Sequence, residues 1–291
     1  MESAVVQREP FERGLREFGW KPGANIVIDY RYGEGTPKRL TEQAAQLVKS
    51  GVDVIVARGP AAIRAVRSAT TRIPIVMSAG EDSVAEGFVR TMARPGGNVT
   101  GIDSLVFDLD AKRLELLREA FPRVRRVGVL TNPNTSPARD KERLTHLHGV
   151  AQSAGVELQL FEVRKPEDLA AVSEAFGRGQ LDGLLARGDP QVLDPNRQQI
   201  VAIAAKHRIP AVYPWRFFVE VGGLMSYGTN LSAFHYRSAT YVDRILKGAN
   251  PGDLPIEQPT KFDLVVNLKS ARTLGLEIPK AVLFRADEVL E

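Results

Sequence analysis

The chain has 291 residues, with 39 Lys and Arg against 35 Asp and Glu, a formal net charge of +4 and a pI near 9.3. This length predicts one large or two medium domains. Hydrophobic residues make up 43% of the chain, enough for a sizeable core, which excludes an intrinsically disordered protein. The sequence contains no cysteine, and this excludes disulfides, thiolate catalysis and cysteine-ligated zinc.

Charged residues of both signs are mixed along the chain, without a run of Lys and Arg. A nucleic-acid-binding protein usually carries a basic face, so we expect no nucleic-acid partner. No apolar run approaches the roughly 18 residues that a membrane-spanning helix needs. Residues 1–10 lack a basic segment followed by an apolar one, and we therefore expect no signal peptide in this chain.

Short apolar runs rich in β-branched residues alternate along the chain with amphipathic runs of helix length. This order predicts βαβ units and a mostly parallel sheet that is covered on both faces. The predicted strands span residues 25–32, 52–57, 73–78, 127–131, 157–163, 183–186, 210–213 and 224–227. The predicted helices span residues 9–19, 37–50, 61–70, 109–121, 138–154, 166–177, 195–207 and 232–247.

Two parts of the chain repeat the same order of elements. Residues 57–59 and 186–188 both read Ala-Arg-Gly at the end of a predicted strand, and a helix follows each. We therefore predict two α/β lobes of similar topology, joined near clusters of Gly and Pro. Lobe 1 is expected to hold residues 1–102 and 228–258, lobe 2 residues 105–222 and 262–291, with a hinge near 99–105, 222–228 and 255–262.

The comparison of the two lobes exposes a gap. The second lobe starts with a strand at 127–131 before its first helix, whereas the first lobe starts directly with the helix at 9–19. We predict that the first strand of lobe 1 is missing, and that a longer precursor carries it, together with a secretion signal, ahead of Met1. The alternative is that lobe 1 does without this strand. Open sheet edges favour pairing with another chain, so we also expect self-association through lobe 1.

Ligands of open α/β sheets bind beyond the carboxyl ends of the strands. Two lobes that face each other therefore place two sets of loops around one cleft. The expected ligand-binding residues of the first lobe are Arg58, Gly59, Ser78, Ala79 and Glu81. Those of the second lobe are Asn132, Asn134, Arg187, Asp189, Tyr213, Trp215 and Tyr227. Arg holds a carboxylate by paired hydrogen bonds and Tyr or Trp stacks on a ring, which suits a small polar or zwitterionic ligand with a flat apolar part.

Each of these residues also has a purely structural interpretation. Arg58 and Arg187 then pair with nearby carboxylates or carbonyls, and Tyr213 and Trp215 are core aromatics at a strand end. The two asparagines then form a turn around the proline between them. Glu81 then begins a helix, where a negative charge is favoured.

Sequence motifs of enzymes are absent. No Gly-x-Gly-x-x-Gly follows a strand, and neither a Walker loop nor a Gly-x-Ser-x-Gly elbow occurs. We expect no catalytic residue, no metal and no cofactor. The four histidines are expected at the surface, and they are His146, His148, His207 and His235.

Sequence blocks along nearly the whole chain carry a resemblance to a known family. They span residues 11–19, 28–33, 53–56, 73–76, 94–101, 112–119, 222–228, 241–248, 254–262, 267–275 and 285–291. In these blocks the chain resembles the ABC transporter substrate-binding proteins of the tryptophan/tyrosine-type family, which are similar in fold to type I periplasmic binding proteins. The last blocks, such as Leu-Pro-Ile-Glu-Gln-Pro-Thr-Lys-Phe at 254–262, are the most specific.

The resemblance implies an α/β fold of two Rossmann-like parallel-sheet lobes joined by a three-crossing hinge. It implies a bacterial solute-binding component of an ABC import system, located in the periplasm or otherwise outside the cytoplasm, and not an enzyme. Such a protein closes about its hinge on one small polar or aromatic molecule and delivers it to a membrane permease with its ATPase. Family members usually begin with an export signal and a first strand, and this chain shows neither.

Two other classes of protein remain as alternatives. A ligand-sensing regulatory domain of the same fold is one, and it would need a DNA-binding headpiece, which the first ten residues cannot form. A two-lobed α/β enzyme such as a glycosyltransferase is the other, and it would need an acid, base or metal constellation that the sequence does not offer. Turnover of a ligand by the purified protein would favour the enzyme.

Overall fold

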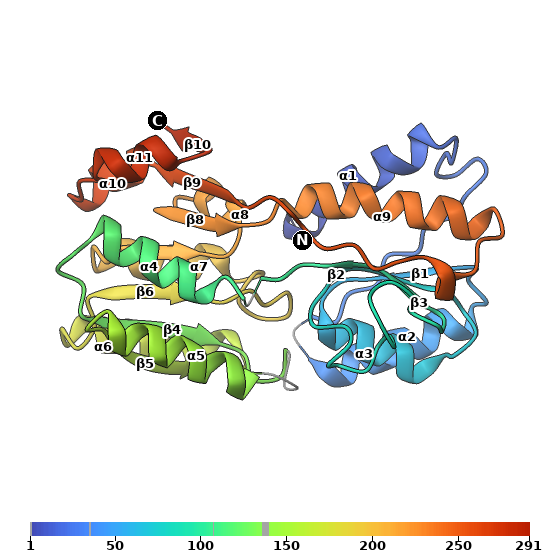
Figure 1. Cartoon of the computed structure of the whole chain (residues 1–291), viewed down its shortest axis with the longest axis horizontal. Coiled ribbons are helices and arrows are strands. Elements are labelled where there is room, and N and C mark those ends of the chain that lie inside the picture. The colour runs from blue at the N-terminus through green and yellow to red at the C-terminus, as the bar shows by residue number, and fades with distance from the viewer. Residues whose placement is uncertain (1, 35, 107, 136–139) are drawn as a thin grey trace. The chain divides into compact units, whose positions relative to one another are not determined.

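The computed structural model (Figure 1) describes residues 2–34, 36–106, 108–135 and 140–291, with side chains from residue 8 onward. The chain divides into two compact units. Unit 1 consists of Met1–Leu105 and Leu231–Pro259, and unit 2 of Val106–Asn230 and Thr260–Glu291. The start of the helix predicted from residue 138 and the end of the loop before it lie outside the described residues.

The sheet of unit 1 has three parallel strands within the described residues, in the order β1 (Ile55–Ala57), β2 (Ile75–Gly80) and β3 (Val99–Asp103). All residues of the central strand β2 are buried, as expected for a parallel strand covered on both faces. Gly101 allows β3 to lie close to β2. Its φ is +128°, and a Cβ there would lie 2.3 Å from the carbonyl oxygen of Met77.

The helices of unit 1 are α1 (Glu2–Glu17), α2 (Pro37–Lys49), α3 (Pro60–Ala69) and α9 (Leu231–Leu246), with a 3-10 turn, η2 (Pro251–Asp253). Helix α9 packs on β2 and β3, whereas α3 packs on β1 and β2 from the other face, and α2 packs on α3 (Figure 1). Helix α1 lies along α9. Gly14 makes this contact possible, because a Cβ there would lie 2.8 Å from the Cβ of Ala239.

Residues 25–32, which the sequence predicts as a strand, do not form one, so that prediction is wrong. Ile26, Ile28 and Tyr30 are half-buried and the residues between them are exposed, which is the period of two that led to the prediction. However, no backbone hydrogen bond joins residues 27–32 to another described residue. The segment has the pattern of a strand but no partner in a ladder.

The sheet of unit 2 has seven strands within the described residues: β4 (Arg126–Thr131), β5 (Glu157–Glu162), β6 (Gly183–Ala186), β7 (Ala211–Tyr213), β8 (Met225–Gly228), β9 (Asp263–Asn267) and β10 (Glu288–Leu290). Their order across the sheet is β10-β9-β8-β7-β6-β4-β5. Neighbouring strands are parallel except β8 and β9, which are antiparallel. Strand β4 therefore lies between β5 and β6, and it is buried from its second residue on.

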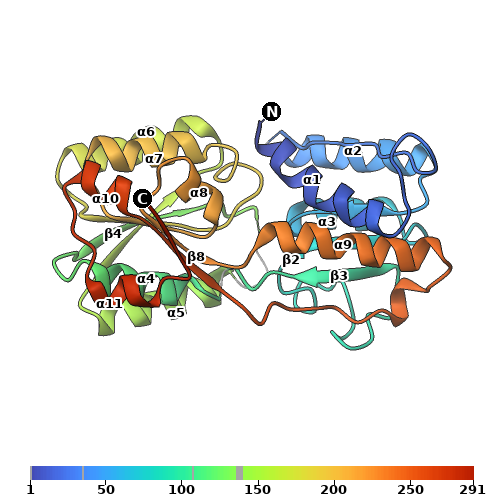
Figure 2. The ribbon, with the colours of Figure 1, turned by 90° about the horizontal axis from the view of Figure 1, so that it is seen from above.

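The helices of unit 2 are α4 (Asp110–Ala120), α5 (Asp140–Ser153), α6 (Leu169–Gly177), α7 (Arg197–Lys206), α8 (Arg216–Glu220), α10 (Leu268–Leu274) and α11 (Lys280–Arg285), with a 3-10 turn, η1 (Pro166–Asp168). Figure 2 shows α4 and α5 on one face of the sheet and α6 and α7 on the other. The core between α4, α5 and the sheet contains Leu117, Val129 and Leu185, which are fully buried. The parallel strands end at one edge of this layered unit, and the loops at that edge hold the candidate site.

Most differences from the sequence prediction concern the ends of the chain. Helix α1 begins at Glu2 rather than at residue 9 and includes Pro10. The sequence pattern also misses β3, whose residues it assigns to the hinge segment 99–105, and α8, β9, α10, α11 and β10. Elements of three to seven residues are too short to show a periodicity.

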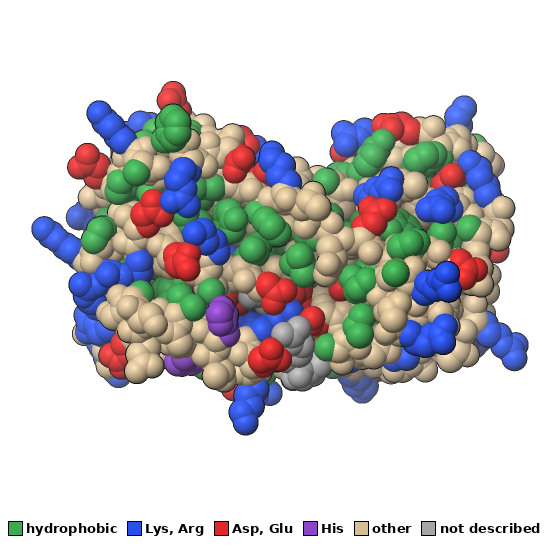
Figure 3. Space-filling view, viewed as in Figure 1, with side chains coloured by type: hydrophobic (Ala, Val, Ile, Leu, Met, Phe, Trp, Pro, Cys, Tyr) green, Lys and Arg blue, Asp and Glu red, His purple; other side chains and the backbone are tan. Residues whose placement is uncertain are grey.

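No helix among the described residues is long and apolar enough to cross a membrane. On the face drawn in Figure 3, Lys and Arg side chains stand among Asp and Glu side chains on each unit. This mixed surface is what the charge balance of the sequence predicts.

Candidate functional site

All twelve residues that the sequence predicts as ligand contacts lie at the carboxyl end of a strand or in the loop after it. In unit 1, Arg58 and Gly59 follow β1, Ser78 and Ala79 lie at the end of β2, and Glu81 follows β2. In unit 2, Asn132 and Asn134 follow β4, Arg187 and Asp189 follow β6, Tyr213 ends β7, Trp215 follows it, and Tyr227 lies near the end of β8. Each unit, taken by itself, thus places its candidates at the sheet edge where ligands of open α/β sheets bind.

In unit 1, strand β2 ends in a bulge. Its ladder with β3 shifts between Ser78 and Gly80, and Ala79 between them has a φ of +151°, which is rare for a residue with a Cβ. The carbonyl of Ala79 accepts a hydrogen bond from the N–H of Gly59 at 3.1 Å. The end of β2 is thereby tied to the turn that begins α3. Backbone strain of this kind clusters at binding sites and switches.

Glu81 connects two loops of the same edge. Its side chain is buried, and Oε2 accepts a hydrogen bond from the hydroxyl of Ser104 at 2.6 Å. The N–H of Ser104 in turn donates to the carbonyl of Gly80 at 2.8 Å. Glu81 therefore helps to hold the loop after β2 against the loop after β3.

Ser78 contacts a histidine that the sequence places at the surface. His235 of α9 is 7% exposed, and its Nδ1 lies 2.7 Å from Ser78 Oγ, so the surface prediction is wrong for this residue. Burial, and next the charge of Arg58, lower the pKa of His235 to about 3, so the ring is neutral at pH 7. The other ring nitrogen, Nε2, is buried, and none of the described residues is its hydrogen-bond partner.

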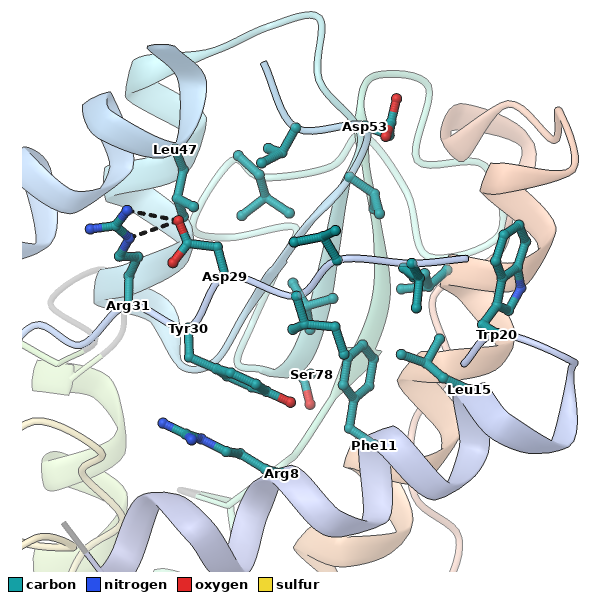
Figure 4. A pocket seen from close by; sticks show the side chains of 18 of the residues that line it. Arg8, Phe11, Leu15, Trp20, Asp29, Tyr30, Arg31, Leu47, Asp53 and Ser78 are labelled. Atoms are coloured by element: carbon teal, nitrogen blue, oxygen red, sulfur yellow. Dashed lines mark hydrogen bonds and ion pairs between the residues drawn. The ribbon is translucent and has the colours of Figure 1, made fainter. Parts of the chain in front are cut away.

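A pocket with a volume of about 680 Å³ opens beside this pair within unit 1 (Figure 4). Of the twelve predicted residues, Arg58 and Ser78 line it, together with His235. Phe11 and Leu15 extend into it from α1 (Figure 4). Apolar side chains such as Phe11 and Leu15 therefore share the lining with a neutral imidazole and with the guanidinium groups of Arg8, Arg31 and Arg58.

In unit 2, Arg187 is 2% exposed at the end of β6 and is held by two carboxylates. Its Nε donates to Asp110 Oδ2 at 2.6 Å, and its Nη1 donates to Asp140 Oδ1 at 2.5 Å and to Thr131 Oγ1 at 3.0 Å. Burial by itself lowers the pKa of Arg187, but the charges of Asp110 and Asp140 outweigh it, so the pKa is raised. The guanidinium stays charged and joins the ends of β4 and β6 to the first turns of α4 and α5.

Arg113 shares Asp110 with Arg187. Its guanidinium is fully buried, and Nη1 donates to Asp110 Oδ1 and to the carbonyl of Val106, both at 2.7 Å. Its Nε donates to the carbonyl of Tyr227 at 2.8 Å, which connects α4 to the end of β8. The sequence analysis missed Asp110 and Arg113, because acidic and basic residues three apart on a helix usually form a surface pair.

The carboxylate of Asp189 is also occupied by the protein. It accepts hydrogen bonds from the N–H groups of residues 191–193 at 2.7 to 3.1 Å, and from the hydroxyl of Thr135 at 2.8 Å. The amide of Asn132 donates to it at 3.3 Å. The Oδ1 of Asn132 accepts from the N–H of Asn134 at 3.1 Å, which forms the turn that the structural interpretation of this loop expects.

Two tyrosine rings pack against phenylalanine rings at this edge of the sheet in unit 2. Tyr213 is 1% exposed and stacks on Phe218 with ring centroids 4.9 Å apart, and its burial raises the pKa of the hydroxyl. Tyr227 is half-buried, and its ring lies 6.2 Å from that of Phe262. The two tyrosines therefore pack within unit 2, and their rings help to fix the ends of β7 and β8.

Trp215 differs from the other aromatic residues because its polar atom is unused. The side chain is 4% exposed, and the indole Nε1 is buried with no hydrogen-bond partner among the described residues. A buried indole N–H normally finds an acceptor. The hydroxyl of Thr229, directly after β8, is buried without a partner in the same part of the chain. Sequence reasoning did not single out Thr229, since a threonine after a strand carries no signal of its own.

Each edge, taken by itself, therefore presents buried polar groups among its described residues that could form hydrogen bonds to a polar molecule. Trp215 and Thr229 supply an N–H and a hydroxyl in unit 2, and His235 supplies a neutral ring nitrogen in unit 1. Among the described residues, no group of three or more His, Asp and Glu could hold a metal ion.

Known proteins are similar to this chain over most of its length. Residues 2–290 match the family described as ABC transporter substrate binding protein. A tyrosine-binding protein of Clostridioides difficile (strain R20291) is 26% identical over 272 residues, which cover 93% of this chain and 76% of that protein.

Two solved structures are similar along nearly the full length. A conserved domain protein from Vibrio cholerae O1 biovar El Tor is 30% identical with a TM-score of 0.88, and the match covers 99% of this chain and 95% of that one. An ABC domain in complex with L-Trp from Streptococcus pneumonia is 26% identical with a TM-score of 0.87, with the same coverage of 99% and 95%. The predicted two-lobed α/β fold class is confirmed by these matches.

Proposed function

Because the chain belongs to the family of ABC transporter substrate-binding proteins, we propose that it captures an amino acid with an aromatic side chain. Two relatives support this ligand class. The similar protein of Clostridioides difficile is named a tyrosine-binding protein, and the similar Streptococcus structure holds L-Trp. The observation in this chain that carries the proposal is the buried, unpartnered Nε1 of Trp215 beside the aromatic residues of unit 2.

Some of the predicted residues contact the ligand, and others hold the loops around it in place. Arg187 and Asp189 are already bonded to protein groups, so we assign them the role of positioning the loops after β6. Trp215 donates its N–H to the ligand, and an N–H bonded to a carboxylate forms a strong, charge-assisted hydrogen bond. Arg58 is half-buried and adds positive charge from unit 1.

Closure about the hinge remains part of this proposal. A ligand that bonds to both units stabilises the closed state by the difference between its affinities for the closed and open states. The sequence predicts this hinge near 99–105, 222–228 and 255–262. The chain changes unit at 105–106, 230–231 and 259–260, and our proposal moves the hinge to these three points.

The proposal also extends to partners and location. The loaded protein delivers its ligand to a membrane permease with its ATPase, in the periplasm or elsewhere outside the cytoplasm. It leaves the ligand chemically unchanged. Self-association through unit 1 also belongs to this proposal, because an open edge of a sheet pairs readily with another chain.

Isothermal titration calorimetry tests the ligand class. The protein is unfolded in denaturant and refolded to remove bound ligand, and is then titrated with L-Trp and L-Tyr, with L-Leu and D-ribose as controls. We expect one aromatic amino acid bound per chain. The variant Trp215→Phe loses one hydrogen bond to a charged group, worth about 1.5–3 kcal/mol, so its affinity falls about 10- to 150-fold.

The chain contains a matched control. It has only two tryptophans, and the Nε1 of the other one, Trp20, donates to Asp243 Oδ1 at 2.9 Å within unit 1. Trp20→Phe should therefore bind the ligand as the wild type does. Equal affinities of Trp215→Phe and wild type would overturn the role of Trp215, and no binding of either aromatic amino acid would overturn the ligand class. Chemical conversion of the ligand, seen by mass spectrometry after incubation, would overturn the assignment as a binding protein.

A further inference from the structure

The buried arginines among the described residues of unit 2 are Arg113, Arg143, Arg187 and Arg197. The first three each lie 2.6 to 3.4 Å from a carboxylate oxygen, of Asp110 or of Asp108. A buried guanidinium is normally paired in this way, because an isolated charge is costly to remove from water. Arg197 differs from them, since no described carboxylate forms an ion pair with it.

The contacts of Arg197 inside unit 2 do not replace the missing carboxylate. Its side chain is 8% exposed, and its Nη1 donates to the carbonyl of Asp194 at 3.3 Å. Its Nε is buried and has no hydrogen-bond partner among the described residues. The guanidinium carbon lies 5.5 Å from the centre of the Phe217 ring, close to the limit of about 6 Å for a cation–π contact. The positive charge of Arg197 therefore lacks a counter-charge.

The fold places this charge at the edge of the sheet where ligands bind. Arg197 is the first residue of α7, which follows the loop after β6, and Phe217 lies in the first turn of α8, which follows β7. Helices α7 and α8 pack on each other (Figure 2). The rings of Phe217 and Trp215 lie with their centroids 6.5 Å apart. Arg197 thus belongs to the same edge of unit 2 as Trp215.

A third side chain of this edge also has an unused donor. The Nε2 of Gln191, in the loop between β6 and α7, is buried without a partner among the described residues. Gln191, Arg197 and Trp215 therefore each hold a buried N–H group that has no acceptor. Buried donors without an acceptor are few in a folded protein, so three on adjoining loops indicate a molecule that supplies acceptors. The charge of Arg197 requires that molecule to be an anion.

We propose that Arg197 binds the carboxylate of the captured molecule and selects ligands that carry this group. The inference rests on the proposed function, because an amino acid supplies the carboxylate. Arginine holds a carboxylate by charge-assisted hydrogen bonds, which a neutral amide cannot form with equal strength. Arg187, which the sequence predicts for this role, already has Asp110 and Asp140 as partners.

Calorimetric titration with a pair of matched ligands tests this role. L-Trp and L-tryptophanamide share the indole ring and the amino group, which is protonated in both at about pH 6, and they differ in the carboxylate. We expect the wild type to bind L-Trp at least tenfold more tightly than the amide. Arg197→Gln should weaken L-Trp at least tenfold and change the affinity for the amide less than twofold. Arg197→Lys keeps the charge and should retain part of the preference for the acid.

Arg216 provides a matched control at the same edge. It is exposed, and it already pairs with Glu220 at 2.7 Å and with Glu288. Arg216→Gln should therefore bind L-Trp as the wild type does. Equal weakening of L-Trp and the amide by Arg197→Gln would assign Arg197 a structural role only and overturn the proposal. An unchanged affinity of this variant for L-Trp would overturn it as well.

A second measurement separates this proposal from the ligand class. The melting temperature is measured in sodium benzoate and in sodium chloride of equal ionic strength, since a carboxylate that binds the folded protein raises it. We expect benzoate to stabilise the wild type and not Arg197→Gln. If neither L-Trp nor L-Tyr binds the wild type, the aromatic ligand class fails, and the benzoate result decides on Arg197. No rise in that case, or equal rises in both proteins, would overturn the carboxylate site.

The wild type alone gives a result if Arg197→Gln does not fold. Equal affinities of the wild type for L-Trp and L-tryptophanamide would overturn the proposal without any variant. Arg197→Lys then takes the place of Arg197→Gln in both measurements. A preference for the acid that this variant reduces at least threefold supports the role of the guanidinium, and an unchanged preference overturns it.

Discussion

The substitution Asp110→Asn removes the negative charge that two buried arginine side chains share. Asp110 accepts from Arg113 at 2.7 Å and from Arg187 at 2.6 Å, and the side chains of the three residues are at most 5% exposed. Asparagine keeps the shape and one acceptor oxygen but not the charge. The two guanidinium groups then remain buried with less compensation.

The expected cost follows from the geometry. Removing one partner of a buried ion pair typically costs about 3–5 kcal/mol. Arg187 keeps Asp140 and Thr131, and Arg113 keeps two carbonyls, so we expect the lower end, about 3 kcal/mol. For a cooperative unit of this size, each kcal/mol lowers Tm by about 2–4 °C, so Tm should fall by about 6–12 °C.

Urea unfolding followed by fluorescence measures this effect in unit 2 alone. In a Trp20→Phe background the remaining tryptophan is Trp215, which lies in unit 2. The control is Glu174→Gln, which breaks an ion pair with Arg178 whose side chains are more than 60% exposed and should cost less than about 0.5 kcal/mol. A loss below about 1 kcal/mol for Asp110→Asn would refute the view that this cluster holds the edge of unit 2 together.

Three further predictions concern single positions. The pKa of His235 is lowered to about 3 in the folded protein, so as the pH falls below 6.5 the unfolded chain takes up a proton at this residue and the folded chain does not. The free energy of unfolding of the wild type should therefore fall between pH 6.5 and pH 3. Its decline should be about 1.4 kcal/mol per pH unit steeper than that of His235→Gln. Gly101→Ala should cost about 3 kcal/mol in urea unfolding, because its Cβ meets the backbone of β2, whereas Gly97→Ala, with open space around its Cβ, should change stability by less than about 0.5 kcal/mol. Leu117→Ala, at a fully buried position of α4, should lower the free energy of unfolding of unit 2 by about 2–5 kcal/mol. A loss below about 1 kcal/mol would show that the neighbouring side chains move in and fill the cavity that the substitution leaves.

Local sequence signals account for most of the elements. Helices α2 and α3 begin with a proline in the first turn, where its missing N–H has no cost. Strand β2 is an apolar run of the kind that fills the centre of a parallel sheet. Residues 25–32 carry an equally clear pattern but form no strand, because a strand also needs a neighbour to bond with, and a local pattern says nothing about that neighbour.

The candidate site shows the same division between local and distant information. The sequence predicts correctly that the chosen residues follow strand ends, since strands and turns leave local signals. It misses Asp110, because the partner that makes this residue important, Arg187, lies far along the chain. For His235 a signal was available: Leu231, Ala239 and Val242 share its face of α9 and are buried, and helical spacing alone places His235 among them.

Burial decides how the predicted polar residues divide between positioning and recognition. A buried charged group needs partners of opposite charge or several hydrogen bonds. Arg187 has two carboxylate partners, and Asp189 accepts hydrogen bonds from backbone N–H groups. Their bonds fix the loops after β4 and β6, and a bound molecule that displaced them would have to replace every one of those bonds. Trp215 is buried to a similar extent, but its N–H has no described acceptor. A ligand carboxylate gains a hydrogen bond there without breaking one, so recognition at this edge should depend on Trp215. Arg187 and Asp189 fix the loop after β6, whose Gly188 lies against the Trp215 ring.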